Sequence, residues 1–221
     1  MSQSYKKGNF VKRYKVMKQQ GFTLIEMVIV LGLLALVAGI AISQYDGNRG
    51  KGVALYSKLK QYGESMKRMK FDTQCYPTKT GALFSRDISD ESHCGINLQQ
   101  NWKGPYVQST QLDTNDDIAM LEFSESSSLI LPPPATADIN GSGNRRQWTI
   151  IVTNVPDDVI NVAMEECNNG YSDDTQTEFK QGQCFIVPNA ARGTAVSNPN
   201  FDFLDGTSSS NSIGYIFDER A

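Results

Sequence analysis

The stretch that decides the fold is GFTLIEMVIVLGLLALVAGIAI, which runs from Gly21 to Ile42. Between Phe22 and Ile42 the only charged side chain is Glu26. Because an α-helix rises about 1.5 Å per residue, a helix of this length spans about 30 Å, the thickness of the hydrocarbon core of a bilayer. The stretch therefore predicts a membrane-spanning helix that carries one carboxylate near its start.

The residues before this helix are basic. Through residue 21 the chain holds six lysines and arginines and no acidic residue, so the N-terminus is expected in the cytoplasm and everything after Ile42 outside. A cleaved secretory signal is disfavoured, because the following SQYDGNRG has no small-residue cleavage site. A plain uncleaved anchor leaves Glu26 unexplained, since a carboxylate in lipid costs roughly 2.5 to 3.5 kcal/mol at the helix centre.

Gly21 followed by Phe-Thr-Leu-Ile-Glu and a long apolar helix closely resembles the prepilin signature of type IV pilins. The resemblance implies that a prepilin peptidase cuts after Gly21 and that the new N-terminus, Phe22, is methylated. Glu26 then stands at the fifth position of the mature chain. There it can pair with the Phe22 ammonium of its own chain or of a neighbour, near the positive end of the helix dipole.

The same resemblance implies an α+β fold, in which a long N-terminal helix with a protruding apolar half packs on an antiparallel β-sheet. It also implies a homo-oligomeric helical filament, an assembly ATPase, a platform protein and a secretin. The precursor would lie in the inner membrane and the mature subunit in an extracellular pilus at the cell surface. The 21-residue leader and 200-residue mature chain resemble a type IVb major pilin, whereas Phe22 is more usual in type IVa pilins and pseudopilins.

Two other functions stay open. One is a minor pilin or a pseudopilin of type II secretion, and the other is a membrane-tethered adhesin that does not polymerise. The predicted organisation is a leader at 1–21, an apolar helix at 22–46, an amphipathic half of the helix at 47–70, and an outer domain at 71–221. A glycine cluster near residue 50 weakens the helix, at about 1 kcal/mol for each glycine relative to alanine, and is interpreted as either a loop or a hinge.

Apolar residues beyond the glycine cluster recur at helical spacing and predict one buried stripe: Leu55, Leu59, Tyr62, Met66 and Met69. Five strands are expected in the outer domain, at Ile118–Phe123, Ser128–Leu131, Gln147–Thr153, Cys184–Val187 and Ile213–Phe217. Prolines and glycines between the second and third strands predict an exposed connection. A short helix follows Pro156, with an apolar face that includes Cys167.

Four cysteines, an even number, favour disulfide bonds in an oxidising compartment. A metal site is disfavoured because the chain has one histidine, His93, and no CxxC pair. Three pairings are possible, and nearness in sequence favours Cys75 with Cys94 and Cys167 with Cys184. The second pair, on a short helix and a following strand, resembles the C-terminal disulfide region of type IVb pilins.

Charge and motifs give no reason to expect catalysis, a cofactor or nucleic-acid binding. Without its first 21 residues the chain would have 15 basic and 24 acidic residues, whereas nucleic-acid binding requires a basic surface. The stretch 113–117 resembles the start of a calcium loop but lacks the glycine and glutamate that an EF-hand needs, so a solvated turn is favoured. Asp202 and Asp205 are treated as either a turn or a calcium site, and His93 as a surface residue.

Overall fold

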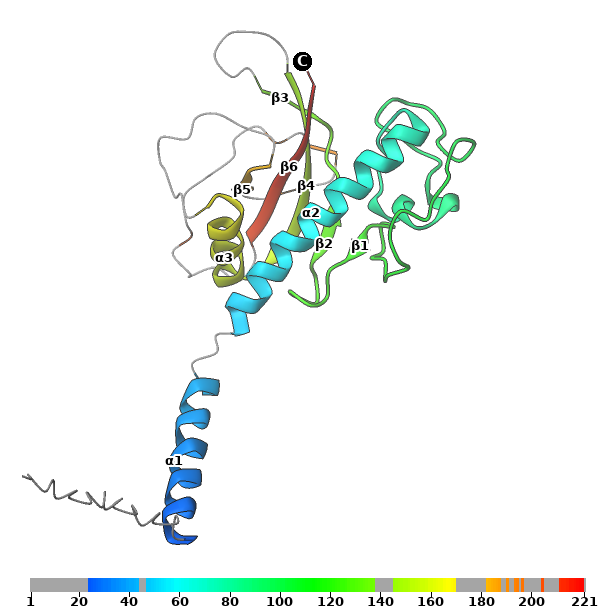
Figure 1. Cartoon of the computed structure of the whole chain (residues 1–221). Coiled ribbons are helices and arrows are strands. Elements are labelled where there is room, and N and C mark those ends of the chain that lie inside the picture. The colour runs from blue at the N-terminus through cyan, green and yellow to red at the C-terminus, as the bar shows by residue number, and fades with distance from the viewer. Residues whose placement is uncertain are drawn as a thin grey trace, which may run out of the picture. The chain divides into compact units, whose positions relative to one another are not determined.

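The computed structural model describes residues 24–43, 47–137, 145–169, 182–187 and 211–220, together with residues 190, 193, 194, 196 and 204. The chain divides into two units, Met1–Tyr45 and Asp46–Ala221 (Figure 1). The predicted leader, with Gly21 and Phe22, lies outside the described residues.

The described part of the first unit is the helix α1 (Leu24–Ser43). Its side chains are described as far as Leu36, and all of these are exposed within the unit. Glu26 lies in its first turn. Among the described residues, no helix has the combination of length and hydropathy that a membrane crossing requires.

The second unit begins with α2 (Gly47–Thr73), which includes the glycine cluster. The expected poor continuity at these glycines is therefore not found from Gly47 onward, where the backbone is helical. The predicted apolar stripe is confirmed, because Leu55, Leu59, Met66 and Met69 are all fully buried. The fifth member, Tyr62, is partly buried and packs against the same core.

Within the described residues the sheet is antiparallel and has six strands, in the order β1-β2-β4-β6-β5, with β3 pairing with β4 as well. The strands are β1 (Ile118–Ala119), β2 (Ser128–Ile130), β3 (Ala135–Ala137), β4 (Arg145–Val155), β5 (Cys184–Ile186) and β6 (Asn211–Arg220). All five predicted strands are present, although β1 is shorter than expected because the chain turns at residues 121–123.

The connection between β2 and β4, which the sequence predicts to be exposed, contains a strand that was not predicted, β3, whose Ala135 lies opposite Gln147 of β4. The strand β3 has only three residues, all with small side chains, and backbone pairing holds it in the sheet. It therefore leaves no periodic hydrophobic pattern in the sequence.

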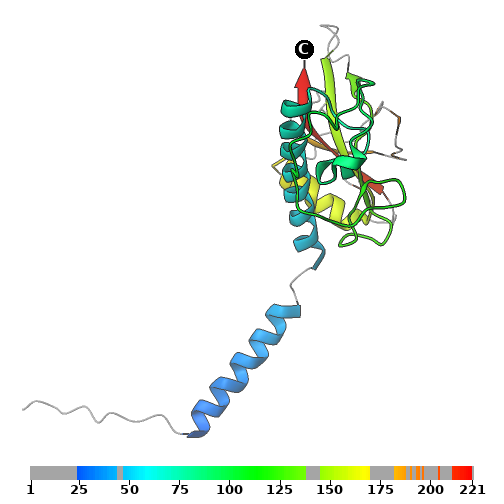
Figure 2. The ribbon, with the colours of Figure 1, turned by 90° about the vertical axis from the view of Figure 1, so that its right-hand side faces the viewer.

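Helix α3 (Asp157–Cys167) follows Pro156 as predicted, and its whole apolar face is buried. Two short 3-10 helices, η1 (Thr80–Leu83) and η2 (Arg86–Ile88), lie in the segment that follows α2. Helix α2 lies across one face of the sheet, with α3 beside its N-terminal half (Figures 1 and 2).

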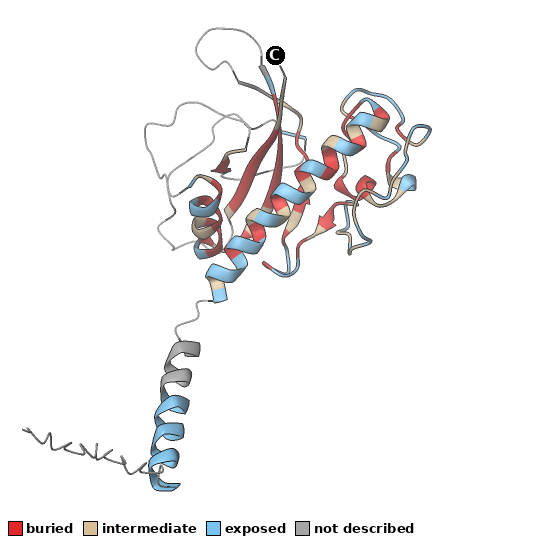
Figure 3. Ribbon diagram, viewed as in Figure 1, coloured by how far each residue is buried: buried red, intermediate tan, exposed pale blue. Residues whose placement is uncertain are grey.

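The alternating side chains of β4 contribute to two hydrophobic clusters. Trp148, Ile150 and Val152 join the larger cluster together with α2, α3 and β6. Ile151 joins a smaller cluster with Phe185 of β5 and other residues on the opposite face. Figure 3 shows that the central strands and the inner side of α2 are buried while the outer side of α2 is exposed.

Two glycines of α2 allow the helix to approach its neighbours closely. A Cβ atom added to Gly63 would lie 2.7 Å from the Cβ of Phe217 in β6, and one added to Gly52 would lie 2.5 Å from the Cβ of Val162 in α3. Both distances are far below van der Waals contact, so these two positions require glycine for packing.

Candidate assembly site

The described part of α1 has apolar side chains on all sides. Leu24 is 83% exposed and Val30, the most covered of the large apolar residues, still 44%. A helix that is hydrophobic all round is normally buried, either in a core or in a bilayer. Apolar patches of this extent mark surfaces that are covered by a partner or by lipid.

Glu26 is the acidic residue of the first turn of α1. A carboxylate at this end interacts favourably with the positive end of the helix dipole, which typically contributes about 0.3 to 1 kcal/mol. Because Gly21 and Phe22 lie outside the described residues, the cleavage site, the methylated amine and its pairing with Glu26 stay predictions.

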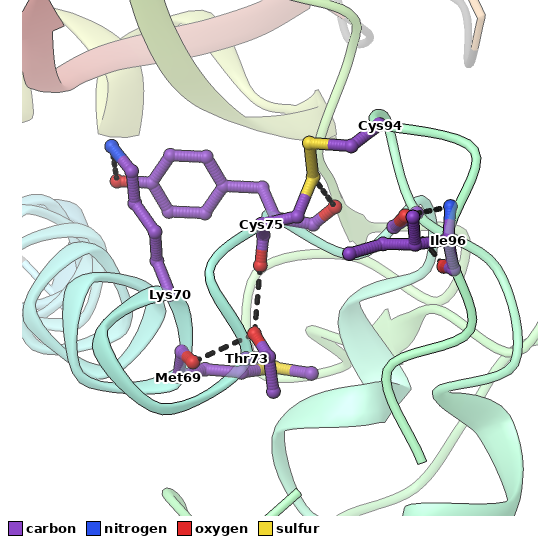
Figure 4. The surroundings of a disulfide bond; sticks show 8 residues. Met69, Lys70, Thr73, Cys75, Cys94 and Ile96 are labelled. Atoms are coloured by element: carbon purple, nitrogen blue, oxygen red, sulfur yellow. Dashed lines mark hydrogen bonds between the residues drawn. A yellow bond between two sulfur atoms is a disulfide. The ribbon is translucent and has the colours of Figure 1, made fainter. Parts of the chain in front are cut away.

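Both predicted disulfide bonds are present in the second unit. Cys75 is bonded to Cys94 and Cys167 to Cys184, with Cα atoms 6.2 Å and 5.9 Å apart. The first bond closes the loop that follows α2 (Figure 4). At the end of α2 the hydroxyl of Thr73 lies 2.8 Å from the carbonyl oxygen of Met69 and 2.9 Å from that of Cys75, which joins this loop to the last helical turn.

A polar cluster next to this disulfide was not found by sequence reasoning. The hydroxyl of Tyr76 donates a hydrogen bond of 2.7 Å to Oδ2 of Asp218, and Lys70 forms an ion pair with the same carboxylate. The Lys70 ammonium also lies 4.3 Å from the centre of the Tyr76 ring, within the range of a cation–π interaction. The cluster links α2, the disulfide loop and β6.

The expectation that His93 is a surface residue is wrong. Its side chain is half-buried, with the ring 5.3 Å from that of Trp148 and Nε2 3.3 Å from the carbonyl oxygen of Leu131. Burial lowers the pKa of His93 below its ordinary value, and the hydrogen bond to Leu131 only partly opposes this. The ring packs against the core, where burial disfavours its charged form.

The acidic stretch at 113–117 forms a turn, but the expectation that it is solvated fails at Asp117, which is buried and accepts a hydrogen bond of 2.9 Å from the backbone N–H of Thr80. Oδ1 of Asp113 accepts hydrogen bonds from the backbone N–H groups of Asn115 and Asp117, at 2.8 Å and 2.9 Å. Asp116 forms an ion pair with Lys79. Asp202 and Asp205 lie outside the described residues.

The model of the prokaryotic N-terminal methylation motif matches residues 16–42 of this chain. The matched segment contains Gly21, Phe22 and Glu26, and it covers most of α1. The match supports a type IV pilin or pseudopilin-like prepilin and points to a structural protein. An N-terminal helix followed by an antiparallel sheet is consistent with the α+β type IV pilin fold that the sequence predicted. Searches of curated proteins and of solved structures gave no match to this chain.

Proposed function

We propose that this chain is a structural subunit of a type IV pilus filament that polymerises through its N-terminal helix. The observation that carries the proposal is the methylation motif at residues 16–42, which overlies a helix with apolar side chains exposed on all sides. In a bilayer that surface is covered by lipid, and in a filament by the same helix of other subunits.

Cleavage after Gly21 would free an ammonium group on Phe22, one helical turn before Glu26. Methylation leaves this amine charged. In the low dielectric of a helix bundle an unpaired Glu26 is costly, whereas a Glu26 that meets the ammonium of a neighbouring subunit is compensated. The ion pair would thus fix the stagger between helices while apolar contacts supply the attraction.

The proposed precursor is held in the inner membrane, with its N-terminus in the cytoplasm, until a prepilin peptidase removes the leader. An assembly ATPase and a platform protein would then extract the subunit into a filament, which reaches the cell surface through a secretin. A second candidate is a minor pilin or a type II secretion pseudopilin, which Phe22 as first mature residue favours.

The proposal is tested on filaments sheared from cells that make the full chain. N-terminal sequencing should give methylated Phe22, and Glu26→Ala should remove the subunit from filaments while the processed chain stays in the membrane fraction. Glu125→Ala, an exposed glutamate of the globular unit, is the matched control and should assemble normally. Wild-type cells without filaments, or a subunit that begins elsewhere, would overturn the proposal, and a subunit present only in traces would favour the minor-pilin alternative.

A further inference from the structure

Charge is distributed unevenly over the globular unit. Residues 47–73, which form α2, carry seven basic and two acidic residues, whereas residues 74–221 carry eight basic and 20 acidic ones. One basic helix is therefore attached to a strongly acidic remainder. Opposite charges on two different surfaces of one molecule allow copies of it to attract each other.

Three of the seven cations of α2 already have partners within the unit: Lys58 pairs with Glu122, Lys67 with Glu64, and Lys70 with Asp218. The other four, Arg49, Lys51, Lys60 and Arg68, form no ion pair with any residue in the described part of the chain.

Three of these unpaired cations share one side of α2. Arg49, Lys60 and Arg68 recur at helical spacing together with Val53 and Phe71, and all five are exposed. Phe71 is 81% exposed, which is unusual for a large aromatic side chain. We call these five residues the α2 outer face. An exposed aromatic residue beside arginines is the composition of an interface anchor.

Helix α3 carries the opposite charge. It has four acidic residues and no basic one, and Asp158, Glu165 and Glu166 are exposed; we call these three the α3 outer face. Glu165 and Glu166 lie in the last turn, at the negative end of the helix dipole, where carboxylates are unfavourable. Conversely, Arg49 lies in the first turn of α2, at the positive end of that helix dipole, and this turn contains no acidic residue.

These charges are therefore placed against the dipoles of their own helices. Cations supplied from outside would compensate the end of α3, whereas the start of α2 already has the Asp158 carboxylate of α3 at 3.5 Å from the Asn48 amide nitrogen. Glu64 lies on the same side of α2 but is already paired with Lys67. A symmetric contact between two α2 outer faces would therefore oppose cation to cation and is disfavoured. A contact between two different faces adds each copy to the next in the same way, and it generates an open helical array when the rotation between copies does not close a ring.

We propose that the α2 outer face binds the α3 outer face of a neighbouring copy of this chain. The inference rests on the proposed filament and names a contact between the globular units within it. It is separate from the apolar contacts of α1.

Charge reversal tests the contact in the full chain. Lys60→Glu with Arg68→Glu reverses one face, and Glu165→Lys with Glu166→Lys reverses the other. Each double variant should lower the yield of sheared filaments about ten-fold, the factor that corresponds to about 1.4 kcal/mol, and all four changes together should restore it. Asp87→Lys with Asp90→Lys, two exposed acids of the disulfide loop, is the matched control and should keep the wild-type yield.

Each variant is first measured in the membrane fraction as processed, disulfide-bonded chain, which shows that it has folded. If wild-type cells form filaments and either double variant gives the same yield, the proposed contact is wrong, while the proposed filament function stands. Loss without restoration in the fourfold variant would overturn the pairing of these two faces. Wild-type cells without filaments would instead overturn the proposed function, and the contact with it.

A second measurement does not depend on variants. Filaments formed from a mixture of isotopically light and heavy chains are treated with a zero-length carbodiimide reagent. Peptides that join Lys60 to Glu165 or Glu166, with one light and one heavy half, should be recovered. Filaments that yield other mixed cross-links but not these would contradict the proposal.

Discussion

The Tyr76 hydroxyl donates its hydrogen bond to Asp218 across 142 residues of sequence, so the loop closed by Cys75 and Cys94 is attached directly to β6. Tyr76 is fully buried, with its ring 4.4 Å from that of Trp148 and 5.3 Å from that of Phe217. The aromatic packing and the hydrogen bond to a charged group act on the same side chain and can be separated by mutation.

Tyr76→Phe removes the hydroxyl and keeps the ring. We expect the free energy of unfolding to fall by about 1.5 kcal/mol, the lower end of the range for hydrogen bonds to charged groups, because Asp218 is partly exposed and keeps Lys70. Tyr56→Phe is the control, since the Tyr56 ring packs edge-on against Tyr215 and no hydroxyl bond is found within the described residues. Denaturant unfolding of the detergent-solubilised chain measures both, and equal losses would contradict the role of the hydrogen bond.

Gly63→Ala adds only one methyl group, yet we expect it to lower the free energy of unfolding substantially. The new Cβ would meet the Phe217 Cβ at 2.7 Å, and overpacking of this kind costs about 1 to 3 kcal/mol. Gly47→Ala makes the same change in the same helix with nothing within 4 Å of the new Cβ, so it should be neutral or gain up to about 1 kcal/mol. Thermal unfolding of the two variants in parallel checks the difference, and a Gly63→Ala protein as stable as wild type would contradict the observed packing.

His93 should make stability depend on pH. Because its folded pKa lies below the ordinary 6.5, the unfolded chain binds more protons between the two values. Stability is therefore complete above about pH 6.5 and is lost as the pH falls through the folded pKa. His93→Gln should remove this component, so the stability difference between wild type and variant should change as the pH is lowered. Tryptophan fluorescence follows the unfolding, since Trp148 lies beside the ring, and a difference independent of pH would refute the assignment.

The disulfide bonds should each contribute to stability by a similar amount. They close loops of 19 and 17 residues, for which the chain-entropy account gives about 3 kcal/mol each. Two double variants are compared with wild type by their unfolding midpoints under non-reducing conditions: Cys75→Ala with Cys94→Ala, and Cys167→Ala with Cys184→Ala. Unchanged unfolding midpoints in either double variant would show that the loop is held by its other contacts.

Much of the fold was predictable because its signals are local. The apolar run with Glu26 predicted α1, four-and-three spacing predicted the buried stripe of α2, and short separation predicted both cysteine pairs. The helix that begins after Pro156 was predicted in the same way. These features depend on residues that lie close together in the sequence, which is where periodicity and capping rules apply.

The Lys70, Tyr76 and Asp218 cluster was not predictable from the sequence. Strict alternation would place Phe217 and Asp218 on opposite faces of β6, yet both contact α2, through Gly63 and Lys70 respectively. A register shift between Trp148 and Thr149 of β4 lies directly opposite, and such a bulge redirects side chains. The half-buried position of His93 is likewise a consequence of long-range packing, for which the sequence holds no periodic signal.

The position of β6 between β4 and β5 orders the folding of the sheet. Residues 211–220 come late in the chain, yet both neighbouring strands pair with them. If the chain is exported as proposed, β4 lacks this neighbour until residues 211–220 have crossed the bilayer, and such an intermediate would be exposed to aggregation. Cys167 and Cys184 both precede β6 in the chain, so their disulfide bond could form in that intermediate and stabilise it.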